Sequence, residues 1–174
     1  PASSAASDVY KRQYQYYNEF YMKEIFVLRH AKSSWDNVNL SDHDRPLADR
    51  GIKDAAKLCV FVKNKGYMLD EVLCSTARRA KETFDLTADG FNFEIGRTTY
   101  TDKLYFGDAT DLIKHLRELD ESLNNILIVG HNPTLHHLVE LLANEQIDRF
   151  TTCNLAIISY AVSYTHLTLP TMQV

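Results

Sequence analysis

The chain has 174 residues, of which 45% are hydrophobic, and its 19 basic and 23 acidic residues give a net charge of -4. This balance excludes the basic surface that nucleic-acid binding requires, and no apolar run approaches the roughly 20 residues that span a bilayer. We therefore expect one globular domain with neither a nucleic-acid nor a membrane partner. The three cysteines, Cys59, Cys74 and Cys153, are odd in number and lack CxxC spacing, which predicts no disulfide framework, no zinc site and a cytoplasmic location.

The two ends of the chain are typical of translated adapter DNA. The run DVYKRQ at 8–13 and the run VSYTHL at 162–167 can be encoded by the two strands of a single DNA tag, read in different frames. We therefore expect residues 1–21 and 162–174 to be non-native tails of a domain at 22–161. The alternative is a disordered native tail before the domain and a genuine last strand after it.

An apolar run at 26–28 predicts a buried first strand that ends at Arg29 and His30. In open α/β sheets ligands bind just beyond the carboxyl ends of strands, so a cation and an imidazole at this point suggest a phosphate site. On this stretch alone the alternative is a solvated arginine beside a histidine with another role. The polar residues 33–44 that follow predict a loop over the site.

The rest of the chain predicts strands that alternate with helices. Helices are predicted from 52 until Gly66 stops the run, at 77–86, at 108–119, and after Pro133 through 142. Strands are predicted at 70–75, 91–95, 126–130 and 154–160, and a second loop is predicted at 100–107. Such alternation indicates βα units. The predicted fold is therefore α/β, a three-layer sandwich with a mostly parallel central sheet.

Three predicted strand ends carry the candidate chemistry. They are Arg29-His30, the segment 75–80 with the sequence STARRA, and the segment 130–133 with the sequence GHNP. Helices begin at or soon after these points, so their exposed backbone N–H groups add to the attraction for an anion. Taken singly, the alternatives are an N-cap serine, a solvated pair of arginines and a histidine that merely leads into a helix. Taken together after three apolar strands, the segments predict one phosphate-binding rim.

With these motifs the sequence resembles the histidine phosphatase superfamily, and within it the small SixA-like phosphohistidine phosphatases. The matching segments are LRHAKSSW at 28–35, DRPL at 44–47 ahead of Arg50-Gly51, STARRA at 75–80 ahead of Thr83, and VGHNP at 129–133. The resemblance covers 22–160 and implies a phosphoglycerate mutase-like fold. Ala31 and Thr76 replace a glycine and a proline of the family signature, which changes the freedom of the backbone at these two points.

The resemblance implies that His30 is the nucleophile that becomes phosphorylated, and that Arg29, Arg79 and His131 hold the phosphoryl oxygens. Neighbouring cations disfavour a protonated imidazole, so a pocket that binds phosphate also keeps His30 reactive. Guanidinium and imidazole donors can stabilise the equatorial oxygens without a metal or cofactor, and we expect neither. Arg79 fits the second arginine of the family better than Arg78, because it stands four residues after the serine.

Further candidate substrate-binding residues are Ser75, Arg45, Asn132 and Lys32, which lie in or beside these motifs. Lys32 extends the positive rim, whereas for Arg45 a place in the solvated surface is the alternative.

Members of the superfamily that act on phosphate esters carry a glutamate in the loop that corresponds to 102–108, and this chain has none there. An alkoxide leaving group needs a proton from an acid, whereas the imidazole of phosphohistidine has a reference pKa near 6.5 and leaves with little help. The missing glutamate therefore favours a P–N substrate. Asp108 is the remaining candidate acid, with the N-cap of the next helix as its alternative role.

We therefore expect a phosphatase that acts on a phosphohistidine-bearing protein through a phospho-His30 intermediate. One alternative is a small-molecule phosphomonoesterase of the same superfamily, with a small phosphorylated substrate as its partner. The other is a catalytically silent module that binds phosphate or a phosphoprotein.

Overall fold

The computed structural model describes residues 20–163 and 171–173, which build a six-stranded sheet of order β3-β2-β4-β1-β5-β6. The strands are β1 (Phe20–Arg29), β2 (Glu71–Ser75), β3 (Thr99–Thr101), β4 (Asn125–Gly130), β5 (Leu155–Ser163) and β6 (Thr171–Gln173). The pairs β1–β4, β2–β4 and β2–β3 are parallel. Strand β5 is antiparallel to β1, and β6 is antiparallel to β5. The prediction of a mostly parallel sheet is confirmed.

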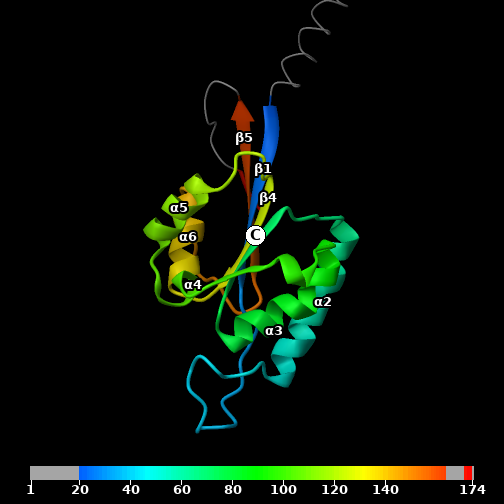
Figure 1. Ribbon diagram of the computed structural model, residues 1–174, viewed down its shortest axis with the longest axis vertical. Coiled ribbons are helices and arrows are strands. Elements are labelled where there is room, and N and C mark those ends of the chain that lie inside the picture. The colour runs from blue at the N-terminus through cyan, green and yellow to red at the C-terminus, as the bar shows by residue number, and fades with distance from the viewer. Residues whose placement is uncertain (1–19, 164–170, 174) are drawn as a thin grey trace, which may run out of the picture.

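Helices cover both faces of this sheet (Figure 1). On one face lie α2 (Asp49–Lys65) and α3 (Arg78–Thr87), and on the other lie α4 (Lys103–Phe106), α5 (Ala109–Glu118) and α6 (Thr134–Ala143). The prediction of three layers is thereby confirmed. Within the described residues no helix is both long enough and apolar enough to cross a membrane.

Two apolar cores lie between the sheet and its helices. Phe26 and Leu28 of β1 belong to the core under α2 and α3, and the intervening Val27 belongs to the core under α5 and α6. Successive side chains of a strand point to opposite faces, and both faces are covered here. This explains why β1 and β4 are unbroken apolar runs in the sequence.

The C-terminal end of α2 agrees with the prediction. Gly66 has a φ of 71°, in the left-handed region, and its N–H donates to the carbonyl oxygens of Val62 and Lys63. A residue without a Cβ adopts this conformation at little cost, so glycine ends the helix here.

The predicted strand at 91–95 is wrong. A 3₁₀ helix covers Ala88–Phe91, Asn92 adopts the left-handed conformation with a φ of 52°, and a second 3₁₀ helix covers Ile95–Arg97. Phe91 and Phe93 are both buried in the core under α2 and α3. Two tight turns thus bury alternate residues on one side, which produces the period of two that is typical of a strand.

The predicted loop at 100–107 is also partly wrong, because it contains most of β3 and the single-turn helix α4. At the other end, β5 continues to Ser163, and β6 lies within the segment that we expected to be a tail. Strand pairing does not bear on the DNA origin of that segment, so the adapter-derived tails stay a prediction. Most of the N-terminal one lies outside the described residues.

Candidate active site

The carboxyl ends of β1, β2 and β4 bring the predicted motifs together. β4 pairs with both other strands, with Arg29 opposite Gly130 and Cys74 opposite Val129. The backbone N–H of His30 donates to the carbonyl oxygen of Gly130 at 3.0 Å, one residue before His131. The rings of His30 and His131 consequently lie 4.8 Å apart, measured between centroids.

Hydrogen bonds define the tautomer of His30. Its Nδ1 lies 2.7 Å from the carbonyl oxygen of Ala31, which can only accept, so Nδ1 carries the proton. Nε2 therefore holds the lone pair, and Arg79 Nε donates to it at 3.3 Å. The buried side chain presents an unprotonated nitrogen beside a guanidinium, which is the arrangement that a nucleophilic imidazole requires.

The surroundings of His30 keep its ring neutral. Burial lowers the pKa of His30 to about 4, and the charges of Arg79, Arg29 and Arg45 act in the same direction, partly opposed by the hydrogen bond to Ala31. Near neutral pH the ring is therefore uncharged and its lone pair is available.

We expect the free energy of unfolding of the wild-type protein to fall as the pH is lowered from about 7.5 to about 5. This fall should be about 2 kcal/mol larger in the wild type than in His30→Gln. The native pKa is about 4 against 6.5 for an ordinary histidine, so the unfolded chain binds the additional proton as the pH falls. This stabilising contribution is complete above the unfolded pKa and is lost as the pH falls toward the native one. Urea unfolding at the two pH values tests this, and equal falls in both proteins contradict it.

His131 completes a second part of the site. Its Nε2 shares a hydrogen bond of 2.9 Å with Ser75 Oγ, and burial, followed by the neighbouring His30 and Arg79, lowers the pKa of His131 to about 3. His131 Nδ1 and Arg29 Nε are buried and have no hydrogen-bond partner among the described residues. A buried polar atom without a partner is uncommon, and these two lie on residues from two of the three predicted motifs.

The backbone around Phe150 holds two more of the predicted residues. Arg29 Nη1 and Asn132 Nδ2 donate to the same carbonyl oxygen of Phe150, at 2.7 Å and 2.9 Å. Burial lowers the pKa of Arg29. The shared carbonyl fixes both side chains at the end of β1 and at the start of the segment that leads into α6.

Two residues that the sequence did not single out, Asp42 and Tyr105, lie in the centre of the site. Asp42 Oδ2 accepts from Arg79 Nη2 at 2.9 Å and from the Tyr105 hydroxyl at 2.8 Å, and Oδ1 accepts from Arg45 Nη1 at 2.8 Å. Burial raises the pKa of Asp42, but the hydrogen bond from Tyr105 and the two arginines outweigh it and hold that pKa below its usual value. Asp42 is therefore an ionised carboxylate that contacts the same arginine as His30.

Tyr105 also contacts the rest of the site through its ring. The ring lies edge-on to His131, at 5.3 Å between centroids, and edge-on to His43 at 5.2 Å. The guanidinium of Arg45 lies 3.4 Å from the centre of the Trp35 ring, and its Nη2 also donates to Ser33 Oγ. The first loop and the α4 segment thus close around the strand ends from two sides.

Lys32 and Asp108 lie apart from this cluster. The side chain of Lys32 is exposed. Asp108 is exposed as well, and its carboxylate accepts from the backbone N–H of Asp111 at 2.9 Å as the N-cap of α5. The geometry therefore favours the capping role of Asp108. In the described part of the chain, no group of three His, Cys, Asp or Glu residues is arranged to hold a metal ion.

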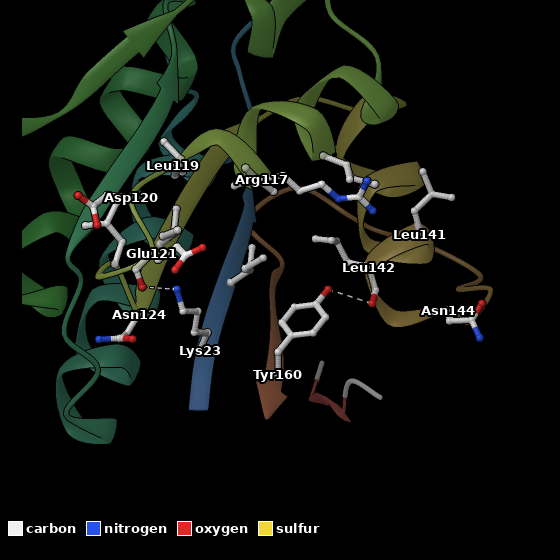
Figure 2. A pocket seen from close by; sticks show the side chains of 15 residues that line it. Lys23, Arg117, Leu119, Asp120, Glu121, Asn124, Leu141, Leu142, Asn144 and Tyr160 are labelled. Atoms are coloured by element: carbon white, nitrogen blue, oxygen red, sulfur yellow. Dashed lines mark hydrogen bonds between the residues drawn. The ribbon is translucent and has the colours of Figure 1, made fainter. Parts of the chain in front are cut away.

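An apolar pocket of about 460 Å³ lies at the opposite end of the sheet (Figure 2). Its wall includes Lys23 of β1 and Tyr160 of β5. Lys23 donates to the carbonyl oxygen of Glu121, and the Tyr160 hydroxyl donates to the carbonyl oxygen of Leu142 at 3.0 Å. None of the predicted site residues line it. Its apolar walls do not offer the converging donors that a phosphate needs, so the strand ends remain the candidate site.

Comparison with known proteins agrees with this geometry. Residues 25–119 match the histidine phosphatase superfamily (branch 1). An uncharacterised protein of Mycobacterium leprae is 32% identical over 158 residues, which are 84% of this chain and 95% of that protein. The phosphohistidine phosphatase SixA of Escherichia coli is 27% identical over 135 residues, or 76% of this chain and 83% of SixA.

Solved structures lead to the same family. The structure of the protein histidine phosphatase SixA complexed with tungstate superposes with a TM-score of 0.73 at 25% identity, covering 87% of this chain and 94% of that one. The matched segment of 25–119 covers more than half of this chain and includes His30 and Arg79. The chain therefore belongs to the histidine phosphatase superfamily.

Proposed function

We propose that this phosphatase removes the phosphoryl group from phosphohistidine on a protein, through a covalent phospho-His30 intermediate. The observation that carries the proposal is the neutral, buried His30, with its Nε2 lone pair beside the guanidinium of Arg79. In the first step Nε2 forms a bond to phosphorus while the P–N bond of the substrate breaks. The substrate ring, protonated on its other nitrogen, leaves as neutral imidazole.

In the second step, water attacks the phosphorus, the Nε2–P bond breaks, and phosphate and a proton are released. Nδ1–H of His30 keeps its hydrogen bond to the Ala31 carbonyl in both steps, which stabilises the ring while it carries the phosphoryl group. Arg29, Arg79 and His131 are the donors we assign to the phosphoryl oxygens, where charge develops during transfer.

The carboxylates of the site favour a P–N substrate over a phosphate ester. Asp42 is the carboxylate that contacts the arginine beside His30, and two arginines keep it ionised, so it has no proton to donate. Asp108 is engaged at the N-terminus of α5. An ester oxygen needs a proton as it leaves, whereas a protonated phosphoimidazole does not. SixA, named as a phosphohistidine phosphatase, supports the same choice.

Exposed aromatic side chains beside the site support a protein substrate. Phe106 is 80% exposed and packs edge-on against Tyr105, and Trp35 is 68% exposed over Arg45. Large aromatic residues are enriched where proteins bind one another, because they bury much apolar area at a small cost in conformational entropy. A small phosphorylated metabolite would leave these two side chains unused.

The test compares phosphate release from a phosphohistidine-bearing carrier protein with the cleavage of p-nitrophenyl phosphate. We expect fast turnover of the carrier, slow ester cleavage, and a loss of at least about 10⁴-fold in His30→Ala, because the nucleophile itself is removed. His137→Ala is the matched control, since His137 is an exposed histidine of α6. Rapid quenching should trap phosphorylated protein in the wild type and in the control, and none in His30→Ala.

Other outcomes would identify the alternatives. Fast ester cleavage with an inert carrier would contradict the proposal and favour a small-molecule phosphomonoesterase, with Asp108 as the candidate acid. Activity on neither substrate, from a folded sample, would favour a binding module.

A further inference from the structure

We propose that Asp42 is a specificity-determining residue, which competes with the phosphoryl group for Arg79 and so keeps inorganic phosphate and small phosphate-bearing compounds out of the site. The inference rests on the proposed phosphoryl site and deepens it. It does not depend on the identity of the carrier protein.

The carboxylate of Asp42 lies between two buried arginines. Its Oδ2 accepts from Arg79 Nη2 at 2.9 Å, and its Oδ1 accepts from Arg45 Nη1 at 2.8 Å. Both guanidiniums belong to buried residues, whereas about half of the Asp42 side chain is exposed. The fixed cations thus come from the body of the protein and the anion comes from a surface loop.

Asp42 occupies a nitrogen of Arg79, Nη2, that a phosphoryl group on His30 would also need. The Nε–H and one Nη2–H of a guanidinium point in the same direction and form a fork that matches two oxygens of a carboxylate or phosphate. In Arg79 the Nε arm donates to His30 Nε2, and the Nη2 arm donates to Asp42 Oδ2. Asp42 also accepts from Nη1 through its carbonyl oxygen, so it lies across the end of the guanidinium. A phosphoryl group bonded to Nε2 lies against the Nε/Nη2 fork, so its oxygens and Asp42 compete for Nη2 and for the charge of Arg79.

The position of Asp42 allows it to move. The surrounding residues 35–39 and 41–42 are exposed, and the local bonds of the segment join polar side chains, such as Ser41 Oγ to Asp44 Oδ2 at 2.6 Å. The Asp42 backbone is attached to the site by its carbonyl oxygen, which accepts from Arg79 Nη1. Within the described part of the chain, the buried apolar clusters include no residue of 35–42, so the cost of displacing the carboxylate is mainly that of its ion pairs and hydrogen bonds.

The competition discriminates between ligands. Free phosphate has only its own charge and hydrogen bonds with which to displace Asp42. A phosphohistidine-bearing protein adds contacts outside the phosphoryl site, where Trp35 and Phe106 are exposed. Trp35 lies in the same loop as Asp42, so a protein that docks on Trp35 can favour the displaced loop, which free phosphate cannot do. Asp42 therefore lowers the affinity for small phosphoanions more than for a protein substrate, and its return to Arg79 favours the release of product phosphate.

The test uses Asp42→Asn, which keeps the size of the side chain and an acceptor for Tyr105 but removes the charge. We expect the Ki for inorganic phosphate to fall at least tenfold, and the ratio of kcat/KM for phosphoramidate to kcat/KM for the carrier protein to rise at least fivefold. Asp44→Asn is the matched control, because Asp44 is an exposed aspartate of the same loop whose carboxylate contacts Ser41 and His43 and neither of the two arginines. Phosphate affinity and small-substrate activity should stay unchanged in that control.

Calorimetric titration with inorganic phosphate, in wild type and Asp42→Asn, makes the result independent of turnover. Tighter phosphate binding in the variant supports the inference even if no phosphohistidine activity is found. Unchanged or weaker binding overturns it, and so does an equal gain of affinity in Asp44→Asn, which would be an effect of net charge alone.

Discussion

Replacement of Arg79 by alanine should lower kcat/KM by about 10³-fold to 10⁵-fold, the range that an arginine supplies to the transition state of phosphoryl transfer. Arg79 Nε lies 3.3 Å from Nε2 of His30, the nitrogen we propose as the nucleophile, and the charge of Arg79 helps to lower the pKa of His30. The variant loses both effects. Arg79→Lys should recover little, because an ammonium group cannot reproduce the fork that faces His30 and Asp42. Single-turnover formation of phosphorylated enzyme measures the step directly.

Arg78→Ala is the matched control for this prediction. Arg78 is the preceding residue and carries the same charge, but it is exposed, and its Nε donates to Glu82 Oε1 at 2.7 Å in an i,i+4 surface pair. We expect kcat/KM within twofold of wild type and a change in stability below about 0.5 kcal/mol. Similar losses of activity in both variants would mean that the positive charge of this turn, and not the fork of Arg79, is what matters.

The sequence alone identified the fold because its strongest signals lie where the backbone is most constrained. β1 and β4 are apolar runs buried on both faces, and each ends in a polar pair with a histidine. Parallel strands place their carboxyl ends at one edge of the sheet. The convergence of His30 and His131 therefore follows from the pattern of strands and helices, before any side-chain contact is known.

The segment 91–95 shows where this reasoning fails. Phe91 and Phe93 alternate with polar residues as in a half-exposed strand, but Asn92 between them has a φ of 52°. Asparagine tolerates the left-handed conformation, and no period in the sequence reports it. The core that receives both rings, against Phe26 and Phe84, is tertiary and could not be predicted locally.

Asp42 and Tyr105 could not be predicted for a different reason. The run around Asp42 has the composition of an ordinary solvated loop, and 37 residues separate it from Arg79. Tyr105 is 63 residues away from Asp42. Only the closure of two surface segments over the strand ends brings these groups together, and neither segment has a periodic pattern that would indicate its path.

Gly51→Ala is expected to cost about 1 to 3 kcal/mol of stability and to lower kcat/KM by about 10²-fold. Gly51 lies in the first turn of α2, and a Cβ at this position would stand 2.2 Å from the carbonyl oxygen of Lys32. The obstacle is backbone, so it cannot rotate away. That carbonyl also accepts from the N–H of Ala48 at 2.8 Å, which ties the start of α2 to the segment directly after His30. Any relief of the clash therefore displaces the backbone next to His30, the proposed nucleophile.

Gly66→Ala separates the two effects. Gly66 has a φ of 71°, and a Cβ added there would meet no neighbouring atom of the described residues within 4 Å. Alanine therefore adds only backbone strain, of about 1 kcal/mol, at the far end of the same helix. We expect this control to lose stability in urea unfolding while kcat/KM stays within twofold of wild type. If Gly51→Ala also keeps its activity and loses only stability, the close contact with Lys32 does not position His30. If it loses both, α2 acts as the support on which the end of β1 is aligned with Arg79.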